Sequence, residues 1–223
     1  LLRGGQVEDI WLDESLSSLA EELGGRSFLP DTATFSNYVA EVVYDAYQYF
    51  ANPGNNNLLQ VADTILPEFG AGWLYARYLT DQFGPGITNQ LEATTLTGTA
   101  NVAFQTGLPF ATTASRWALA NYVSDLPGFA PPPGVFYRSW SFRATFGSLY
   151  QQDPVDFPIP FPLLPPVVSG SGVNVSGVLH SGSGFYVDVH QGPGAAAFTL
   201  HLAGPSALLP AEVVPRMSII RIH

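Results

Sequence analysis

Residues 8–23 read EDIWLDESLSSLAEEL, and this stretch decides how the first two thirds of the chain fold. Leu12, Leu16, Leu19 and Leu23 recur every three or four residues, the spacing of one apolar stripe on a helix. Gly24-Gly25 follows directly and is typical of a helix end. The stretch therefore predicts an amphipathic helix whose acidic side carries Glu14, Ser17, Ser18 and Glu21. By spacing alone, such a side is typical of a solvated helix surface.

Helical periodicity continues to about residue 150. The further predicted helices cover residues 34–51, 68–83, 87–94, 100–106, 110–125 and 138–150. Asp31, Thr32 or Thr34 can cap the first of these. We expect the aromatic side chains to form the core, with Trp11, Trp73 and Trp117 as its anchors.

The composition changes at residue 153. Six prolines between Pro154 and Pro166 predict an extended linker over 153–166, and its apolar side chains favour packing against the helical part. Beyond it the apolar period becomes two. The predicted strands cover residues 173–180, 185–190, 196–202 and 217–222. The sequence thus predicts an α+β chain, with a helical domain over 1–152 and a small antiparallel β-sandwich over 167–223.

Charge and composition exclude several classes of function. The chain has 223 residues, a net charge of −10 and eight arginines without any lysine, which argues against nucleic acid and anionic membrane partners. The absence of cysteine removes disulfides and thiolate chemistry. No run of 18 uncharged apolar residues occurs, so we expect no membrane span.

The segment Trp11-Leu12-Asp13-Glu14-Ser15-Leu16-Ser17 resembles the Trp-Leu-Asn-Glu-Gly-Leu-Ser pattern of zinc peptidases in which a glutamate is the third metal ligand. With Glu8-Asp9 before it and Ala20-Glu21-Glu22-Leu23 after it, the stretch is similar to the hyicolysin-type metallopeptidases. Residues 70–84, GAGWLYARYLTDQFG, resemble the helix that follows the metal-ligand helix in that family. The resemblance covers about residues 8–150.

This resemblance implies a zinc peptidase of the gluzincin type, and a helical part that is the lower half of a zincin-like catalytic domain. Glu14 would be the third zinc ligand, and Glu21, with Ser18 on the same side, would orient a histidine ligand. The implied reaction is hydrolysis of peptide bonds in a peptide or protein substrate by zinc-activated water. The implied location is extracytoplasmic.

The chain departs from the family pattern in one decisive respect, because it contains no His-Glu-x-x-His. The catalytic histidine helix is therefore expected either in a missing N-terminal segment, upstream of Leu1, or nowhere in the protein. Asp13 and Ser15 replace the usual Asn and Gly, and Phe69 stands near a position where relatives carry Tyr. We expect this chain by itself to be inactive and to bind zinc weakly or not at all. A second copy of the chain could cover the apolar patch expected beside Glu14.

Two alternatives remain open for the function. One is a catalytically inactive relative that serves as a structural or binding module. The other is a β-sandwich that targets a substrate or surface, with the helices as its scaffold. His180, His190 and His201 lie on predicted strands, where solvent-exposed histidines are favoured over a three-histidine metal site.

Overall fold

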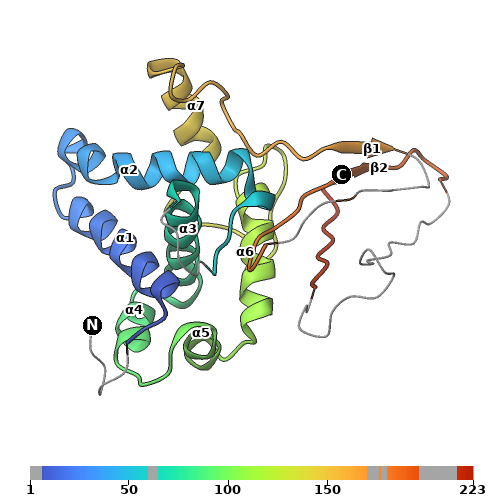
Figure 1. Ribbon diagram of the computed structural model, residues 1–223. Helices are drawn as coiled ribbons and strands as arrows, with labels where there is room; N and C mark the ends of the chain where they lie inside the picture. The colour runs from blue at the N-terminus through green and yellow to red at the C-terminus, as the bar shows by residue number, and fades with distance from the viewer. Residues whose placement is uncertain (1–6, 60–64, 170–175, 177–179, 196–214, 223) are drawn as a thin grey trace.

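A computed structural model describes residues 7–59, 65–169, 176, 180–195 and 215–222 of the chain. These residues form a helical body with two short strands at one end (Figure 1). The helices are α1 (Ile10–Arg26), α2 (Thr32–Ala51), α3 (Leu66–Phe83), α4 (Gly86–Glu92), α5 (Gly98–Thr106), α6 (Phe110–Val123) and α7 (Phe142–Gln152). A single 3₁₀ turn, Pro53–Asn55, follows α2, and the strands are β1 (Val167–Ser169) and β2 (Asp188–His190).

Helix α3 is the centre of the fold, and every residue from Gly70 to Asp81 is buried. Figure 1 shows α1 on one side of α3 and α6 on the other, while α2 runs across the upper end of α3. Aromatic rings fill the space between these helices. Trp73, Trp117, Tyr49 and Tyr75 are the largest of the fully buried side chains. The expectation of an aromatic core is therefore confirmed.

The predicted helices are present, but the predicted end of the first one is wrong. Helix α1 continues through Gly24-Gly25 to Arg26. A Cβ atom on Gly25 would overlap the side chain of Tyr38 in α2, so this glycine allows two helices to approach closely. Gly25 thus allows close helix packing, and Gly24-Gly25 does not end the helix. Asp31 caps α2 as expected, because its side chain accepts hydrogen bonds from the amides of Ala33 and Thr34.

The predicted antiparallel β-sandwich is wrong. Within the described residues the only sheet pairs β1 with β2 in parallel, with Val167 opposite Asp188 and Ser169 opposite His190. Residues 217–222 form no strand, and the expected strands at 173–180 and 196–202 lie almost entirely outside the described residues. An alternating pattern does not say what an extended segment pairs with.

The helical body provides hydrogen-bond partners for part of the extended C-terminal segment. The amides of Leu58 and Leu59 both donate to the carbonyl of Ser181. The Tyr186 hydroxyl donates to the carbonyl of Ala118 in α6 at 2.8 Å. The C-terminal segment therefore satisfies part of its polar groups against the helices, and does not need a second sheet to do so.

The proline-rich segment packs against the helices, as its alternating apolar residues predict. Phe157 and Leu163 belong to the buried core. The Tyr47 hydroxyl of α2 donates to the carbonyl of Ile159 and accepts from its amide. None of the helices in the described part of the chain is both long and apolar enough to cross a lipid bilayer.

Candidate functional site

Glu14 lies on α1 at the border between its buried and exposed sides. Trp11, Leu12 and Ser15 face the core, whereas Glu14 is half-buried. Its carboxylate forms no hydrogen bond or ion pair with any other residue that the structure describes. The Glu14 carboxylate thus has no protein partner among the described residues, and its role as a zinc ligand stays a prediction.

Ser18 and Glu21 do not share the environment of Glu14. Ser18 is buried, at the limit with 9% of its surface exposed, whereas Glu21 is exposed. Helical spacing places Ser18 one turn and Glu21 two turns beyond Glu14 on the same side of α1. Burial along this side therefore changes from half-buried Glu14 through buried Ser18 to exposed Glu21.

Two contacts hold the first half of α1 in place. The Glu8 carboxylate, buried just before the helix, accepts from the Gly98 amide at 2.6 Å and from the Asn101 side chain at 3.1 Å. Ser15 packs directly on Gly72 of α3, where a Cβ atom would overlap its hydroxyl. Glu14 is therefore carried by a helix that is fixed at its start and along its buried side.

Sequence analysis did not single out Glu22, which is the most tightly bound carboxylate of α1. It is fully buried and accepts from the indole N–H groups of Trp73 and Trp140, each at 2.9 Å, and from Arg26 Nε at 2.7 Å. Arg77 lies 3.5 Å from the same carboxylate. Two features of the sequence could have indicated that Glu22 is buried and paired. It lies three residues after Leu19, inside the apolar stripe, and an arginine follows four residues later.

A second unpaired carboxylate lies on α2. Asp45 is 3% exposed, and its Oδ1 atom has no hydrogen-bond partner among the described residues. Its backbone packs against Gly70 of α3. Burial and the nearby negative charge of Glu41 raise the pKa of Asp45 to about 7. The spacing of the acidic residues of α2 does not indicate that Asp45 is buried. Its burial follows from the place where α3 crosses α2.

These residues do not make a metal centre by themselves. No group of three or more His, Cys, Asp or Glu side chains gathers within the described ranges in a way that could hold a metal ion. His190 is exposed and lies 3.3 Å from Asp188, His180 is half-buried, and His201 lies outside the described residues. Among the residues that the structure describes, no two further ligand side chains gather beside Glu14.

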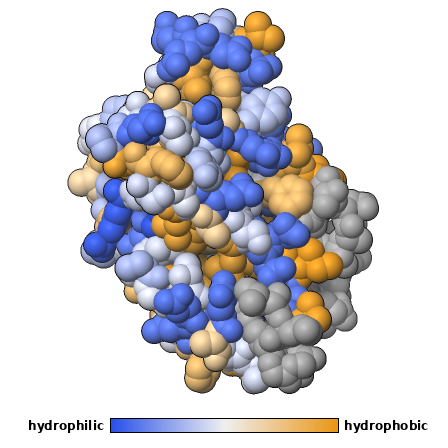
Figure 2. Space-filling model, turned by 90° about the vertical axis from the view of Figure 1, so that its left-hand side faces the viewer, coloured by the Kyte–Doolittle hydropathy of each residue, from blue (hydrophilic) through white to orange (hydrophobic). Residues whose placement is uncertain are grey.

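Apolar side chains reach the surface near both ends of α1. Val7 and Ile10 are 69% and 58% exposed, and Ile10 lies one turn before Glu14. At the other end, Phe28 stacks on Tyr38 with both rings partly exposed. Figure 2 shows apolar groups in separate patches among polar ones on one side of the molecule. Ile10 is thus an exposed apolar side chain one turn before Glu14.

Comparison with known proteins adds no relative. No family model, no curated protein and no solved structure matches the chain.

Proposed function

We propose that this chain supplies the glutamate ligand of a zinc peptidase site, with Glu14 as that ligand. The single observation that carries the proposal is the Glu14 carboxylate, which is half-buried, free of protein partners in the described chain, and held on a fixed helix. A carboxylate without an ion pair can bind a metal ion directly, and the groups that hydrogen-bond a ligating carboxylate would then come from outside the described residues.

The two histidine ligands would come from a polypeptide segment outside these 223 residues. A helix that carries His-Glu-x-x-His presents both histidines on one face, and zinc then completes its protein ligands with one carboxylate. The exposed Ile10, one turn before Glu14, gives that helix an apolar contact. When bound, zinc would activate a water for attack on a peptide carbonyl. Of this chain's residues, Glu14 would hold the metal.

The experiment measures zinc affinity by calorimetry with a synthetic helical peptide that contains His-Glu-Ala-Ala-His. We expect weak zinc binding by the chain alone, and binding to the mixture at least about tenfold tighter than to the peptide alone. Glu14→Gln should abolish that gain. Asp13→Asn is the matched control, since Asp13 is the adjacent residue and points about 100° away around the helix.

Two results would overturn the proposal. One is a mixture that binds zinc no more tightly than the peptide. The other is a tight 1:1 site on the chain alone that Glu14→Gln leaves intact, which would direct attention to the histidines near the C-terminus. A mixture that binds zinc through Glu14 but does not hydrolyse an unstructured polypeptide would favour the catalytically inactive relative. Phe69, near a position where relatives carry Tyr, is in keeping with that alternative.

A further inference from the structure

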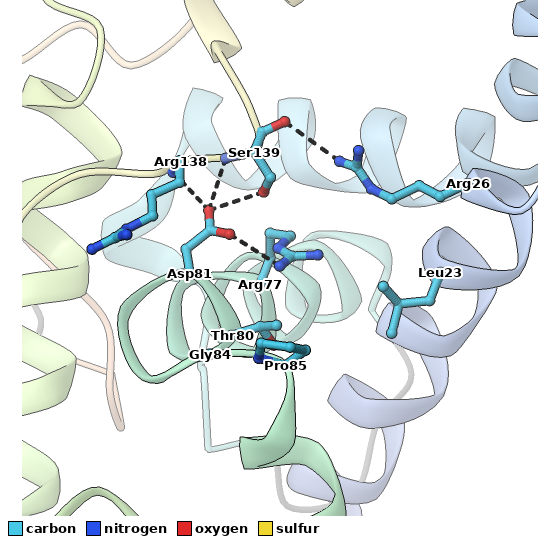
Figure 3. Close-up of a pocket in the computed structure, with 9 residues that line it drawn as sticks. All are labelled: Leu23, Arg26, Arg77, Thr80, Asp81, Gly84, Pro85, Arg138 and Ser139. Carbon is cyan, nitrogen blue, oxygen red and sulfur yellow. Dashed lines mark hydrogen bonds and ion pairs between the residues drawn. The ribbon is translucent and has the colours of Figure 1, made fainter. Parts of the chain in front are cut away.

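A pocket of about 440 Å³, the arginine pocket, lies between the ends of α1 and α3 and is lined in part by Arg26, Arg77 and Arg138. Arg77 is paired with Asp81 at 3.0 Å, and Glu22 lies 2.7 Å from Arg26 and 3.5 Å from Arg77. Figure 3 shows the Arg138 guanidinium pointing away on the far side of Asp81. The chain's own carboxylates therefore neutralise the other two arginines, and another surface of the molecule is better suited to a partner.

That surface is covered by a strap, residues 180–187, which crosses from the loop after α2 to α6 directly before β2 (Figure 1). The amides of Leu58 and Leu59 donate to the Ser181 carbonyl at 3.0 and 3.1 Å. The Ser181 amide in turn donates to Asn57 Oδ1 at 3.0 Å. On the strap these bonds involve main-chain atoms alone, so they do not depend on the identity of the side chain at position 181.

The helical body holds its side of this contact in place. Asn57 donates from its amide and from its side chain to Glu68 Oε1, at 3.1 and 2.9 Å, and Glu68 is buried in the first turn of α3. The strap approaches so closely that a Cβ atom on Gly182 would lie only 2.9 Å from Leu58 Cβ, and Gly182 has a φ of +74°. The contact therefore requires glycine directly after the residue that is bound through its main chain.

One side chain anchors the strap at its other end. The Tyr186 ring packs against the hydrophobic core, and its hydroxyl donates to the carbonyl of Ala118 in α6 at 2.8 Å. Burial raises the pKa of the Tyr186 hydroxyl, so the group keeps its proton for this bond. The neighbouring Phe185 is 45% exposed and lies near Gly54. The helical body thus selects tyrosine at the fifth position after the residue that is bound through its main chain.

The strap is attached less firmly than the helices beneath it. Four hydrogen bonds join it to the helical body within the described chain. Residues 180–195 are all described and none of them is buried, whereas Leu58 below the strap is 1% exposed. A segment with few buried contacts opens at a lower free energy than the core that it covers. Release of the strap therefore exposes a site that the helices already hold in shape.

We propose that this surface is a docking site for an extended peptide, and that the strap fills it in cis. Main-chain hydrogen bonds combined with one side-chain pocket are a usual way to recognise an extended peptide. The partner is a polypeptide with glycine directly after the main-chain-bound residue and tyrosine four positions after that glycine. Because the strap is tethered, it competes at a high effective concentration and keeps the site closed. Glu14 takes no part in these contacts, so this proposal and the zinc site can fail independently.

The test measures fluorescence anisotropy of a labelled peptide, HSGSGFYVD, which has the sequence of residues 180–188. We expect the full chain with Tyr186→Ala to bind it at least about tenfold more tightly than wild type, because its own strap competes less. Phe185→Ala is the matched control, since it removes an exposed aromatic from the same strap, and it should behave as wild type. A peptide with alanine in place of tyrosine should bind Tyr186→Ala about tenfold more weakly.

The proposal is overturned if HSGSGFYVD at about 1 mM does not bind Tyr186→Ala, or if the alanine peptide binds equally well. Hydrogen exchange on the wild-type chain gives a second test that does not depend on the folding of a variant. The Leu58 and Leu59 amides should exchange at least about tenfold faster than the buried amides of α3, because they open when the strap leaves. Exchange as slow as that of α3 would show that the strap leaves only on global unfolding, and would contradict the proposal.

Discussion

At the scale of single residues, two neighbouring carboxylates of α1 lie in opposite environments. Glu22 is fully buried and bound by two tryptophan N–H groups and an arginine, whereas Glu21 is exposed. Removal of Glu22 would leave the indole N–H groups of Trp73 and Trp140 and the Arg26 Nε–H without their acceptor.

We therefore expect Glu22→Ala to lower the free energy of unfolding by about 3–5 kcal/mol, measured by urea denaturation. Glu21→Ala is the matched control and should change it by less than about 0.5 kcal/mol. Similar losses for both variants would contradict the assigned role of Glu22.

The raised pKa of Asp45 makes stability depend on pH. The folded chain holds this proton up to about pH 7, whereas an unfolded aspartate releases it near pH 3.9. Between these values the folded state binds more protons, so stability falls as the pH rises from about 4 to about 7 and is constant above that range.

We expect this residue to account for about 2–4 kcal/mol across the window, since each unit of pKa shift corresponds to about 1.4 kcal/mol. Asp45→Asn should remove that contribution and make the chain more stable than wild type at pH 8. Urea denaturation at a series of pH values checks the prediction. Glu41→Gln, an exposed change one turn away, should retain most of the slope; an unchanged slope in Asp45→Asn would disprove the assignment.

At the scale of secondary-structure elements, glycines set the spacing of the central helices. Gly70 of α3 lies against the Asp45 carbonyl of α2, and Gly72 lies against Ser15 of α1. Since the clashing atoms at Gly70 are backbone, the helices themselves must move to admit a side chain.

We predict that Gly70→Ala lowers the free energy of unfolding by about 1–3 kcal/mol, the usual cost of overpacking. Gly147→Ala in α7 should instead raise it by about 0.5–1 kcal/mol, because no atom lies within 4 Å of the added Cβ and alanine favours the helix. Thermal unfolding of the two variants gives opposite shifts of Tm if the packing of Gly70 is as described. Stabilisation by both would show that α2 and α3 are not in close contact.

At the scale of the whole molecule, the proline-rich segment belongs to the same folded unit as the helices. The Phe157 ring lies 4.9 Å from that of Tyr47 and 5.8 Å from that of Tyr44, both in α2. Two residues earlier, Val155 is 85% exposed. The segment therefore adds buried area to the helical core.

Phe157→Ala should lower the free energy of unfolding by about 3–5 kcal/mol, whereas Val155→Ala should lower it by less than about 0.5 kcal/mol. Chymotrypsin should leave the wild-type segment near Phe161 intact and cleave it readily in Phe157→Ala, with cleavage followed by mass spectrometry. Rapid cleavage of the wild type at Phe161 would show that the segment is a free tether.

The sequence by itself determined the helices and the content of the core. Apolar residues at helical spacing, the Asp31 cap and the large aromatics are local signals, and they predicted α1 to α6 to within a few residues at each end. Spacing from Leu12 and Leu16 places Glu14 at the edge of the apolar stripe, and the family resemblance singled it out. Its role as a zinc ligand stays a prediction that rests on the resemblance.

Only the tertiary structure decided which polar groups are buried and what the extended segments pair with. Glu22 and Asp45 have ordinary helical spacing, and each is buried because a neighbouring helix crosses above it. The arginine pocket joins residues more than a hundred positions apart in the sequence. The C-terminal segment has strand-like alternation, yet part of its backbone bonds to the helical body, as at Ser181. Periodicity records which side of a segment is apolar, whereas the partner that covers it depends on how the chain packs.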